Sequence, residues 1–298
     1  MTARAPAKIN LALRVGPLRA NGYHDLATVF HAVSLHEEVT AEEADDFSVT
    51  VEGDECAGVP TSEDNLAVRA ARLLAKHAKI DAGVHLTIRK AVPVAGGMAG
   101  GSADAAAALV ACDALWRTDV ARADLQALAA RLGSDVPFAL VGGTVLGTGR
   151  GDRLSPVLGR GEYHWVLAIA DEGLATPQVY ERLDTLRTGH VVPEPGVDPE
   201  ILSALRAGDV RALAAALDND LQAAAVACAP RLRATLEAGD YAGALAGIVS
   251  GSGPTCAFLV RDAQHALDVA ISLSAAGVCR TVRRVHGPVP GARVVLSG

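Results

Sequence analysis

The stretch Pro93-Val-Ala-Gly-Gly-Met-Ala-Gly-Gly-Ser-Ala-Asp104 runs directly into the helix-forming residues Ala105-Ala-Ala-Ala-Leu-Val-Ala-Cys-Asp-Ala-Leu115. Glycine lets backbone N–H groups approach an anion closely, and the first turn of a helix adds unpaired N–H donors with a partial positive charge. A glycine-rich segment that opens a helix therefore predicts a phosphate-binding loop. On this segment alone, a plain turn with Ser102 as the helix N-cap is the competing interpretation.

The spacing of these glycines excludes two familiar phosphate loops. The stretch does not end in Gly-Lys-Ser or Gly-Lys-Thr, as a P-loop does, and it does not match the Gly-x-Gly-x-x-Gly pattern of dinucleotide-binding folds. A second glycine cluster, Ser250-Gly-Ser-Gly-Pro-Thr255, lies between a predicted helix and a predicted strand. By itself this cluster is typical of a helix-to-strand turn, but two such loops suit a ligand that is held from both sides.

Upstream of the first cluster, residues 8–15 are predicted to form a strand. Its alternation predicts two faces, with Ile9, Leu11, Leu13 and Val15 on one and Lys8, Asn10 and Ala12 on the other. Lys8 and Asn10 should therefore point the same way. A lysine at the start of a core strand is commonly an edge residue whose charged end reaches water, so this position indicates a site only in combination with other segments.

A candidate partner for Lys8 lies in Leu132-Gly-Ser-Asp-Val-Pro-Phe138. Asp135 follows one predicted helix and precedes another, for which Ser134 is the expected cap and Pro137 fits the first turn. An acid in the first turn also complements the helix dipole, which is the structural alternative. The functional interpretation is a carboxylate that accepts a hydroxyl proton beside the Lys8 ammonium.

Two tyrosines stand out in a chain that is only 3% aromatic. Tyr23 lies in the turn Asn21-Gly-Tyr-His-Asp25, and Tyr180 ends the stretch Ala175-Thr-Pro-Gln-Val-Tyr180. Each ring could stack on a nucleobase. The commoner fate of a tyrosine is a packed ring with a solvated hydroxyl group.

The remaining periodicity predicts mixed α and β structure in two domains. The predicted strands cover residues 48–52, 84–88, 165–170, 255–260 and 278–285, and the predicted helices cover residues 66–79, 102–116, 122–132 and 263–276. Residues 142–162 are rich in glycine and should hold few long regular elements, so the domain junction is placed there. The predicted domains are residues 1–155 and 156–298.

Composition excludes several classes of function. A formal net charge of -7 argues against a nucleic-acid partner, because no basic surface would neutralise a phosphate backbone. The longest apolar candidate, residues 103–115, is interrupted by Asp104 and Asp113, so no membrane segment is expected. With no signal-peptide pattern at the N-terminus, the predicted location is cytoplasmic. The sequence leaves monomer and homodimer open.

Three motifs, taken in order, resemble those of the GHMP kinase superfamily: Pro6-Ala-Lys-Ile-Asn-Leu11, the first glycine cluster and the second glycine cluster. Further stretches, 19–24, 63–71 and 132–137, resemble the subfamily that phosphorylates a cytidine diphosphate-linked polyol in the non-mevalonate isoprenoid pathway. The resemblance implies an α+β, two-domain GHMP kinase fold, with an N-terminal domain like ribosomal-protein S5 domain 2 and a ferredoxin-like C-terminal domain. It places the active site in the interdomain cleft and implies transfer from ATP with Mg²⁺ to a C2 hydroxyl.

The resemblance also assigns roles to residues. Lys8 and Asp135 match the catalytic pair, and no protein residue is assigned as a metal ligand. The residues that match the ATP site are Asn65, Leu66, Lys90, Pro93, Val94, Ala95, Gly96, Gly97, Met98, Ala99, Gly100, Gly101, Ser102 and Ala103. The residues that match the substrate site are Asn10, Tyr23, His24, Thr176, Pro177, Tyr180, Gly251, Ser252 and Gly253.

The chain departs from the family pattern in two places. Tyr180 stands where a phenylalanine is familiar, which keeps an aromatic face. Ser102-Ala103-Asp104 stands where Ser-Ser-Asn is common, so a carboxylate lies near the expected phosphates and could face Mg²⁺, the helix flank or solvent. Two alternative functions remain at this point. One is another GHMP kinase, acting on homoserine, mevalonate or a sugar; the other is a non-catalytic relative that senses ATP and a metabolite.

Overall fold

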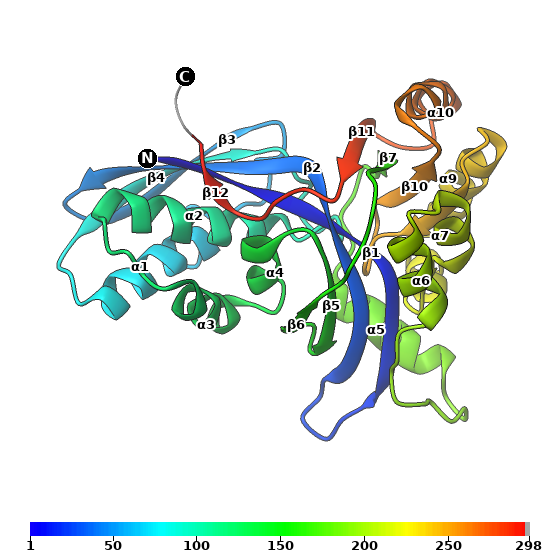
Figure 1. The fold of residues 1–298 in the computed structure, drawn as a ribbon, viewed down its shortest axis with the longest axis horizontal. Coiled ribbons are helices and arrows are strands. Elements are labelled where there is room, and N and C mark those ends of the chain that lie inside the picture. Colours follow the sequence, from blue (N-terminus) through cyan, green and yellow to red (C-terminus); the bar gives the residue numbers. More distant parts are fainter. Residues whose placement is uncertain (296–298) are drawn as a thin grey trace.

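The computed structural model describes residues 1–295 and contains two β-sheets (Figure 1). The eight-stranded sheet contains β1 (Thr2–Leu18), β2 (His24–Ala44), β3 (Phe47–Gly53), β4 (Gly83–Lys90), β5 (Thr144–Gly149), β6 (Arg153–Pro156), β8 (Asp218–Asn219) and β12 (Arg293–Val294). Its central order is β12-β1-β2-β4-β3, with β5 and β6 continuing from β2 and β8 pairing with β1. The four-stranded antiparallel sheet has the order β11-β7-β10-β9 and contains β7 (Tyr163–Ile169), β9 (Ala246–Val249), β10 (Cys256–Val260) and β11 (Thr281–Gly287).

Ten helices pack on these sheets within the described residues. They are α1 (Leu66–Ala78), α2 (Gly100–Trp116), α3 (Arg122–Leu132), α4 (Val136–Val141), α5 (Thr176–Leu186), α6 (Pro199–Ala207), α7 (Val210–Ala216), α8 (Gln222–Cys228), α9 (Arg231–Tyr241) and α10 (Ala263–Ala276). Helices α1 to α4 lie on the N-terminal side, and α5 to α10 lie on the C-terminal side, as Figure 1 shows.

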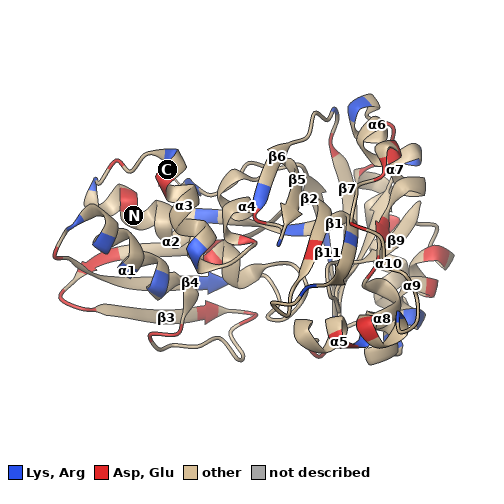
Figure 2. Ribbon diagram, turned by 90° about the horizontal axis from the view of Figure 1, so that it is seen from below, with Lys and Arg blue, Asp and Glu red and all other residues tan. Residues whose placement is uncertain are grey.

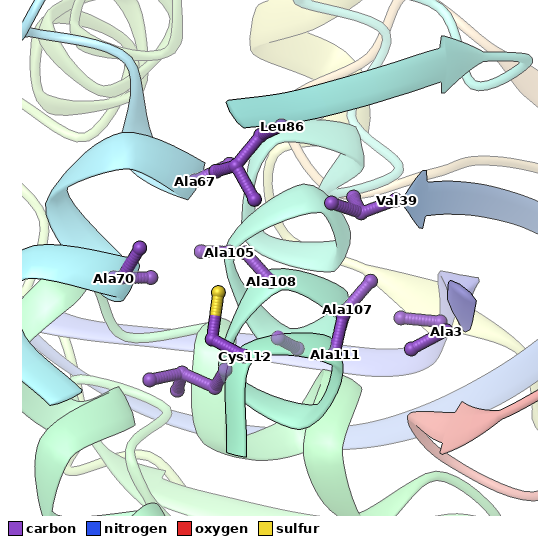
Figure 3. Close-up of a cluster of buried hydrophobic side chains, with 14 of the residues drawn as sticks. Ala3, Val39, Ala67, Ala70, Leu86, Ala105, Ala107, Ala108, Ala111 and Cys112 are labelled. Atoms are coloured by element: carbon purple, nitrogen blue, oxygen red, sulfur yellow. The ribbon is translucent and has the colours of Figure 1, made fainter. Parts of the chain in front are cut away.

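The N-terminal core is built around α2, which is buried on nearly all sides by small residues. Figure 3 shows its alanines facing Ala67 and Ala70 of α1, Val39 of β2 and Leu86 of β4. Because alanine side chains are short, α2 can approach its neighbours closely without leaving voids. The start of this helix, which carries the first glycine cluster, is therefore held on a rigid support.

Long strands join the two halves of the molecule. Ile9 and Leu11 of β1 belong to the same core as Trp165 and Leu167 of β7, so β1 packs against the C-terminal sheet as well as within its own. Strands β8 and β12, late in the sequence, also pair with β1. The two halves are therefore joined by a shared core as well as by strand pairing.

Most predicted elements are confirmed with small changes of length. The helix predicted over residues 263–276 agrees in full with α10, and those predicted over 66–79, 102–116 and 122–132 agree with α1, α2 and α3 within two residues. Strand β2 was not predicted. Residues 142–162 contain only the short strands β5 and β6, in agreement with the prediction of few long elements there. The proposed domain division at residues 155 and 156 falls at the end of β6 and stays a prediction.

Charged residues are distributed over the whole molecule, and the helices are short or only partly apolar. Figure 2 shows acidic and basic residues interspersed over both halves of the ribbon. Among residues 1–295, none of the helices combines the length and the apolar character needed to cross a membrane.

Candidate active site

A cavity of about 1100 Å³ lies between the two halves. Its walls come from β1, β2, the two glycine clusters, the residues before α4 and the start of α5. Small-molecule sites typically occupy 300–1,000 Å³, so this cavity is slightly larger than most such sites. We call residues 93–101 the first glycine loop and residues 250–254 the second glycine loop.

The first glycine loop ends in the open N-terminus of α2. The N-cap residue, Ala99, has a left-handed backbone (φ 59°), and no side chain caps the helix. Ser102 lies inside the first turn, so the interpretation of Ser102 as the N-cap is wrong. The first-turn N–H groups therefore remain available to an anion, and the loop residues line the cavity.

The two glycine loops touch each other. Gly97 has φ +75°, and its carbonyl oxygen accepts hydrogen bonds from Lys8 Nζ at 2.9 Å and from Ser250 Oγ at 3.1 Å. A Cβ atom on Gly97 would overlap the carbonyl oxygen of Ser250. Glycine is needed here both for the positive φ and for this close approach. The contact fixes the first loop against the C-terminal half.

A chain of hydrogen bonds fixes Lys8 in the cavity wall. Thr28 Oγ1 donates to the carbonyl oxygen of Ala12 at 2.7 Å, so it accepts from Asn10 Nδ2 at 2.8 Å. The amide oxygen of Asn10 then faces Lys8 Nζ at 2.7 Å. The prediction that Lys8 and Asn10 share a face is confirmed, and Asn10 holds the ammonium group in place.

The Asp135 carboxylate completes this cluster, with its Oδ2 atom 3.9 Å from Lys8 Nζ. Burial lowers the pKa of Lys8, and the negative charge of Asp135 opposes that shift. Asp135 is half-buried and borders the cavity. A cation and an acceptor therefore converge on one point beside the first glycine loop, where a hydroxyl group could bind to both.

The local structure around Asp135 differs from the prediction in one respect. Asp135 itself is the N-cap residue of α4, and its side chain makes no capping hydrogen bond. Ser134 was expected to cap this helix; instead its hydroxyl group lies 3.4 Å from Asp135 Oδ1, so that expectation is wrong. Pro137 lies in the first turn as predicted. Because the Asp135 carboxylate does not cap α4, it can face the cavity.

The predicted alternation of β1 fails beyond Asn10. The pairing of β1 with β2 shifts between Asn10 and Ala12, so an extra residue interrupts the period of two. Leu11 and Ala12 both enter the core with Ile9, whereas Leu13 borders the cavity together with Lys8 and Asn10. Leu13 is thus on the opposite side from the one predicted.

The far end of the cavity is aromatic. Tyr23, His24 and Tyr180 all border it, and the rings of His24 and Tyr180 lie 5.4 Å apart between centroids. The start of α5 meets the second glycine loop through a 2.9 Å hydrogen bond between Thr176 Oγ1 and Ser252 Oγ. Pro177 also borders this end. An aromatic pocket with polar edges suits a planar base.

Four expected contact residues lie behind the cavity surface. Asn65 caps α1 by accepting from the Ala67 N–H at 2.9 Å, while Leu66 reaches the cavity. The side chains of Met98 and Ala103 are packed in the two cores. Gly253 donates its N–H to the Ser250 carbonyl at 2.8 Å and so closes the second loop. These residues shape the walls and do not line them.

Lys90 belongs to a buried ion triad with Glu37 of β2 and Asp104 of α2. Its Nζ atom pairs with Glu37 Oε1 and lies 2.9 Å from Asp104 Oδ2, and the three side chains are 0–5% exposed. Glu37 also accepts from the Ala91 and Val92 N–H groups, directly before the first glycine loop. Asp104 therefore faces Lys90 on the helix flank.

Sequence reasoning missed several residues that hold the site together. Asn219 Nδ2 donates to the carbonyl oxygens of Val249 at 2.8 Å and Gly251 at 2.7 Å, which fixes the second glycine loop. Arg150 lies with its guanidinium carbon 5.7 Å from the centre of the Tyr23 ring. Thr28 and Glu37 lie in the unpredicted strand β2. One local signal could have indicated Asn219. Asp218 and Asn219 are turn-forming residues that lie shortly before the start of a helix at Gln222.

Within the described residues, no group of three His, Cys, Asp or Glu side chains could hold a metal ion. The site instead offers backbone N–H donors, one ammonium group and one accessible carboxylate. These groups suit phosphates that bring their own metal ion. Mg²⁺ commonly binds in this way, with phosphates and water as most of its ligands.

Comparison with known proteins agrees with this geometry. Residues 65–143 match the GHMP kinases N terminal domain, and residues 201–279 match the GHMP kinases C terminal domain. The 4-diphosphocytidyl-2-C-methyl-D-erythritol kinase of Leifsonia xyli subsp. xyli is 59% identical, covering 98% of this chain and 97% of that protein. The same-named kinase of Mycobacterium tuberculosis (strain H37Rv) is 58% identical, covering 100% and 93%.

Solved structures give the same result. A crystal structure of 4-(cytidine 5'-diphospho)-2C-methyl-D-erythritol kinase is similar with a TM-score of 0.76 and 32% identity, covering 96% of this chain and 98% of that chain. Homoserine kinase from Cytophaga hutchinsonii has a TM-score of 0.75 at 17% identity, covering 99% and 97%, which shows a shared fold alone.

Proposed function

The chain belongs to the GHMP kinase family, and from that premise we propose that it transfers the γ-phosphoryl group of ATP to the C2 hydroxyl of 4-diphosphocytidyl-2-C-methyl-D-erythritol, a step towards isoprenoid precursors. One observation carries the proposal. Lys8 and Asp135 converge beside the first glycine loop, in a cavity whose other end is aromatic.

The nucleotide occupies the end formed by the first glycine loop. Its phosphates accept hydrogen bonds from the N–H groups of the loop and of the first turn of α2. The adenosine lies near Leu66, which the Asn65 cap fixes at the start of α1. Lys90 acts indirectly, because its ammonium group is committed to the buried ion triad that supports the loop.

The transfer step requires few covalent roles from the protein. The C2 hydroxyl oxygen forms a bond to the γ-phosphorus while Asp135 accepts the hydroxyl proton. The bond between the γ-phosphorus and the oxygen that links it to the β-phosphate breaks, which releases ADP. Lys8, held by Asn10, orients the hydroxyl and offsets negative charge on the transferring group. Mg²⁺ arriving with ATP would offset negative charge on the phosphates, and we assign it no protein ligand.

The cytidine occupies the aromatic end. Tyr23 and Tyr180 supply stacking faces, and His24 supplies a polar edge. Thr176, Pro177 and the second glycine loop border the cavity beside this end, where the diphosphate would pass. Arg150, beside Tyr23, adds a positive charge to the same region.

Two alternatives are less well supported. Homoserine and mevalonate kinases share the fold at low identity, so the fold does not choose among substrates, whereas the aromatic end favours a nucleoside. A non-catalytic sensor would not need Lys8 and Asp135 to meet, and here they lie 3.9 Å apart.

Release of ADP tests the proposal directly. Purified protein with ATP and Mg²⁺ should release ADP rapidly with 4-diphosphocytidyl-2-C-methyl-D-erythritol and slowly with the same polyol phosphate lacking cytidine. Homoserine and mevalonate serve as controls. Faster release with either of these would favour another GHMP kinase, and no release with any of them would favour a sensor. We also propose a cytoplasmic location, which cell fractionation with an antibody to the chain would check.

A further inference from the structure

One nitrogen of the His24 ring is already used by the fold. Nδ1 lies 2.8 Å from the carbonyl oxygen of Gly16, in the adjacent strand β1. A carbonyl oxygen only accepts hydrogen bonds, so Nδ1 must carry the proton and donate. In the neutral ring the other nitrogen, Nε2, is therefore an acceptor.

A second acceptor faces Nε2. Asp184 Oδ2 lies 3.4 Å away, beyond the usual range of an N–H···O hydrogen bond. The Asp184 side chain is 37% exposed and that of His24 is 5% exposed, and both residues border the cavity. In residues 1–295, no backbone or side-chain group forms a hydrogen bond with the Asp184 carboxylate. When the His24 ring is neutral, Nε2 and Asp184 Oδ2 are two acceptor atoms side by side with no protein donor between them.

The position of Asp184 on α5 relates this pair to the stacking ring. Asp184 follows Tyr180 by one helical turn, so both side chains lie on the same face of α5. The Tyr180 ring lies 5.4 Å from the His24 ring. A planar base stacked on Tyr180 would present its edge to His24 and Asp184.

We propose that Asp184, together with His24 Nε2, selects cytidine over uridine by accepting hydrogen bonds from the exocyclic amino group of the base. The 4-amino group of cytosine has two N–H donors, one for each acceptor. Uracil has a carbonyl oxygen at the same position, which would face two acceptors and form no hydrogen bond with either. The inference rests on the proposed function, since it assumes that a pyrimidine nucleoside occupies this end.

The size of the preference follows from the charge on Asp184. A hydrogen bond to a charged group typically contributes 1.5–3 kcal/mol, which corresponds to a preference on the order of 10- to 100-fold. Removing Asp184 should therefore reduce the ratio of kcat/KM for the cytidine substrate to that for its uridine analogue by about this factor. Most of the loss should appear in KM, because Asp184 does not touch the reacting hydroxyl.

The test compares wild type, Asp184→Asn and Asp184→Ala, with Glu237→Gln as a control that removes an exposed acid from α9. Asn keeps the shape of Asp and can donate to the uracil carbonyl, so its ratio should fall furthest. Inhibition by CDP and by UDP gives a second readout that needs no turnover, and the same preference should weaken there. Glu237→Gln should leave both ratios unchanged.

The possible failures can be told apart. If the wild type does not turn over the cytidine substrate, the proposed function is wrong. If the wild type is active and the Asp184 variants keep its cytidine-to-uridine ratio, the inference is wrong although the proposed function stands. Equal losses with both substrates would assign Asp184 a structural role only and would also overturn the inference.

Discussion

Replacing Lys90 by methionine should leave two buried carboxylates without the cation they share. Glu37 and Asp104 both pair with Lys90 Nζ, and neither is more than 5% exposed. Breaking a buried ion pair by removing one partner typically costs about 3–5 kcal/mol. Since whole domains are stable by about 5–15 kcal/mol, Lys90→Met should strongly destabilise the N-terminal half.

The pKa of Glu37 determines how the stability of the N-terminal half should depend on pH. Burial raises the pKa of Glu37 to about 7, the charge of Asp104 acts in the same direction, and Lys90 opposes both. Glu37 therefore binds a proton more tightly in the folded state than in the unfolded state. Its contribution to stability is fully present below about pH 4.5 and is lost as the pH rises to about 7. Over that window the loss is on the order of 3 kcal/mol.

Urea unfolding followed by circular dichroism at pH 5, 6, 7 and 8 measures this effect. Glu37→Gln cannot ionise, so the stability of the wild type relative to this variant should decrease between pH 5 and pH 7 and then level off. Lys76→Met, which removes an exposed lysine from α1, is the control for Lys90→Met and should change stability by less than about 0.5 kcal/mol. Equal pH dependence in wild type and Glu37→Gln, or a stable Lys90→Met variant, would refute the reasoning.

Three further variants test the site. Asp135→Asn should lower kcat by about 10²- to 10⁴-fold because a positioned base is lost, while ATP binding measured by calorimetry is retained; normal turnover would remove Asp135 from the mechanism. Tyr180→Ala should weaken binding of the cytidine substrate by about 1–3 kcal/mol in a titration, the usual contribution of one base stack, and an unchanged titration would reject stacking on this ring. Gly97→Ala should abolish ATP binding, because its Cβ would collide with the Ser250 carbonyl and push the two glycine loops apart; wild-type affinity for ATP would contradict that contact.

The sequence predicted the parts of the site that have local signals. The first glycine loop is recognisable because its glycines lead directly into a helix, and the structure has α2 starting at Gly100. The meeting of Lys8 with Asp135 had no such signal. It followed only from the resemblance to the GHMP kinases, whose two-domain α+β fold the comparisons confirm.

Strand β2 was missed because it is buried on both faces. Val29 and Val33 pack in one core, while Phe30 and Ala32 pack in another, so the run of apolar residues shows no alternation. The shift of pairing near Leu11 escaped prediction for a related reason. A bulge changes the phase of a strand through its partner, and the sequence of one strand does not reveal it.

The buried ion triad was also invisible in the sequence. Charged residues are seldom buried without partners, so each of Glu37, Lys90 and Asp104 taken alone would be expected at the surface or at a ligand. Only the packing of β2, the end of β4 and α2 brings them together. Asp104, whose orientation the sequence left open, pairs with Lys90 on the helix flank.

The central claim is that Lys8 and Asp135 act on one hydroxyl beside the first glycine loop. The most direct measurement is a crystal structure of the complex with 4-diphosphocytidyl-2-C-methyl-D-erythritol and a non-hydrolysable ATP analogue. The account predicts the C2 oxygen within about 3.2 Å of the Asp135 carboxylate and about 3–3.5 Å from the γ-phosphorus. A C2 oxygen beyond reach of Asp135, or phosphates bound away from the first glycine loop, would contradict it.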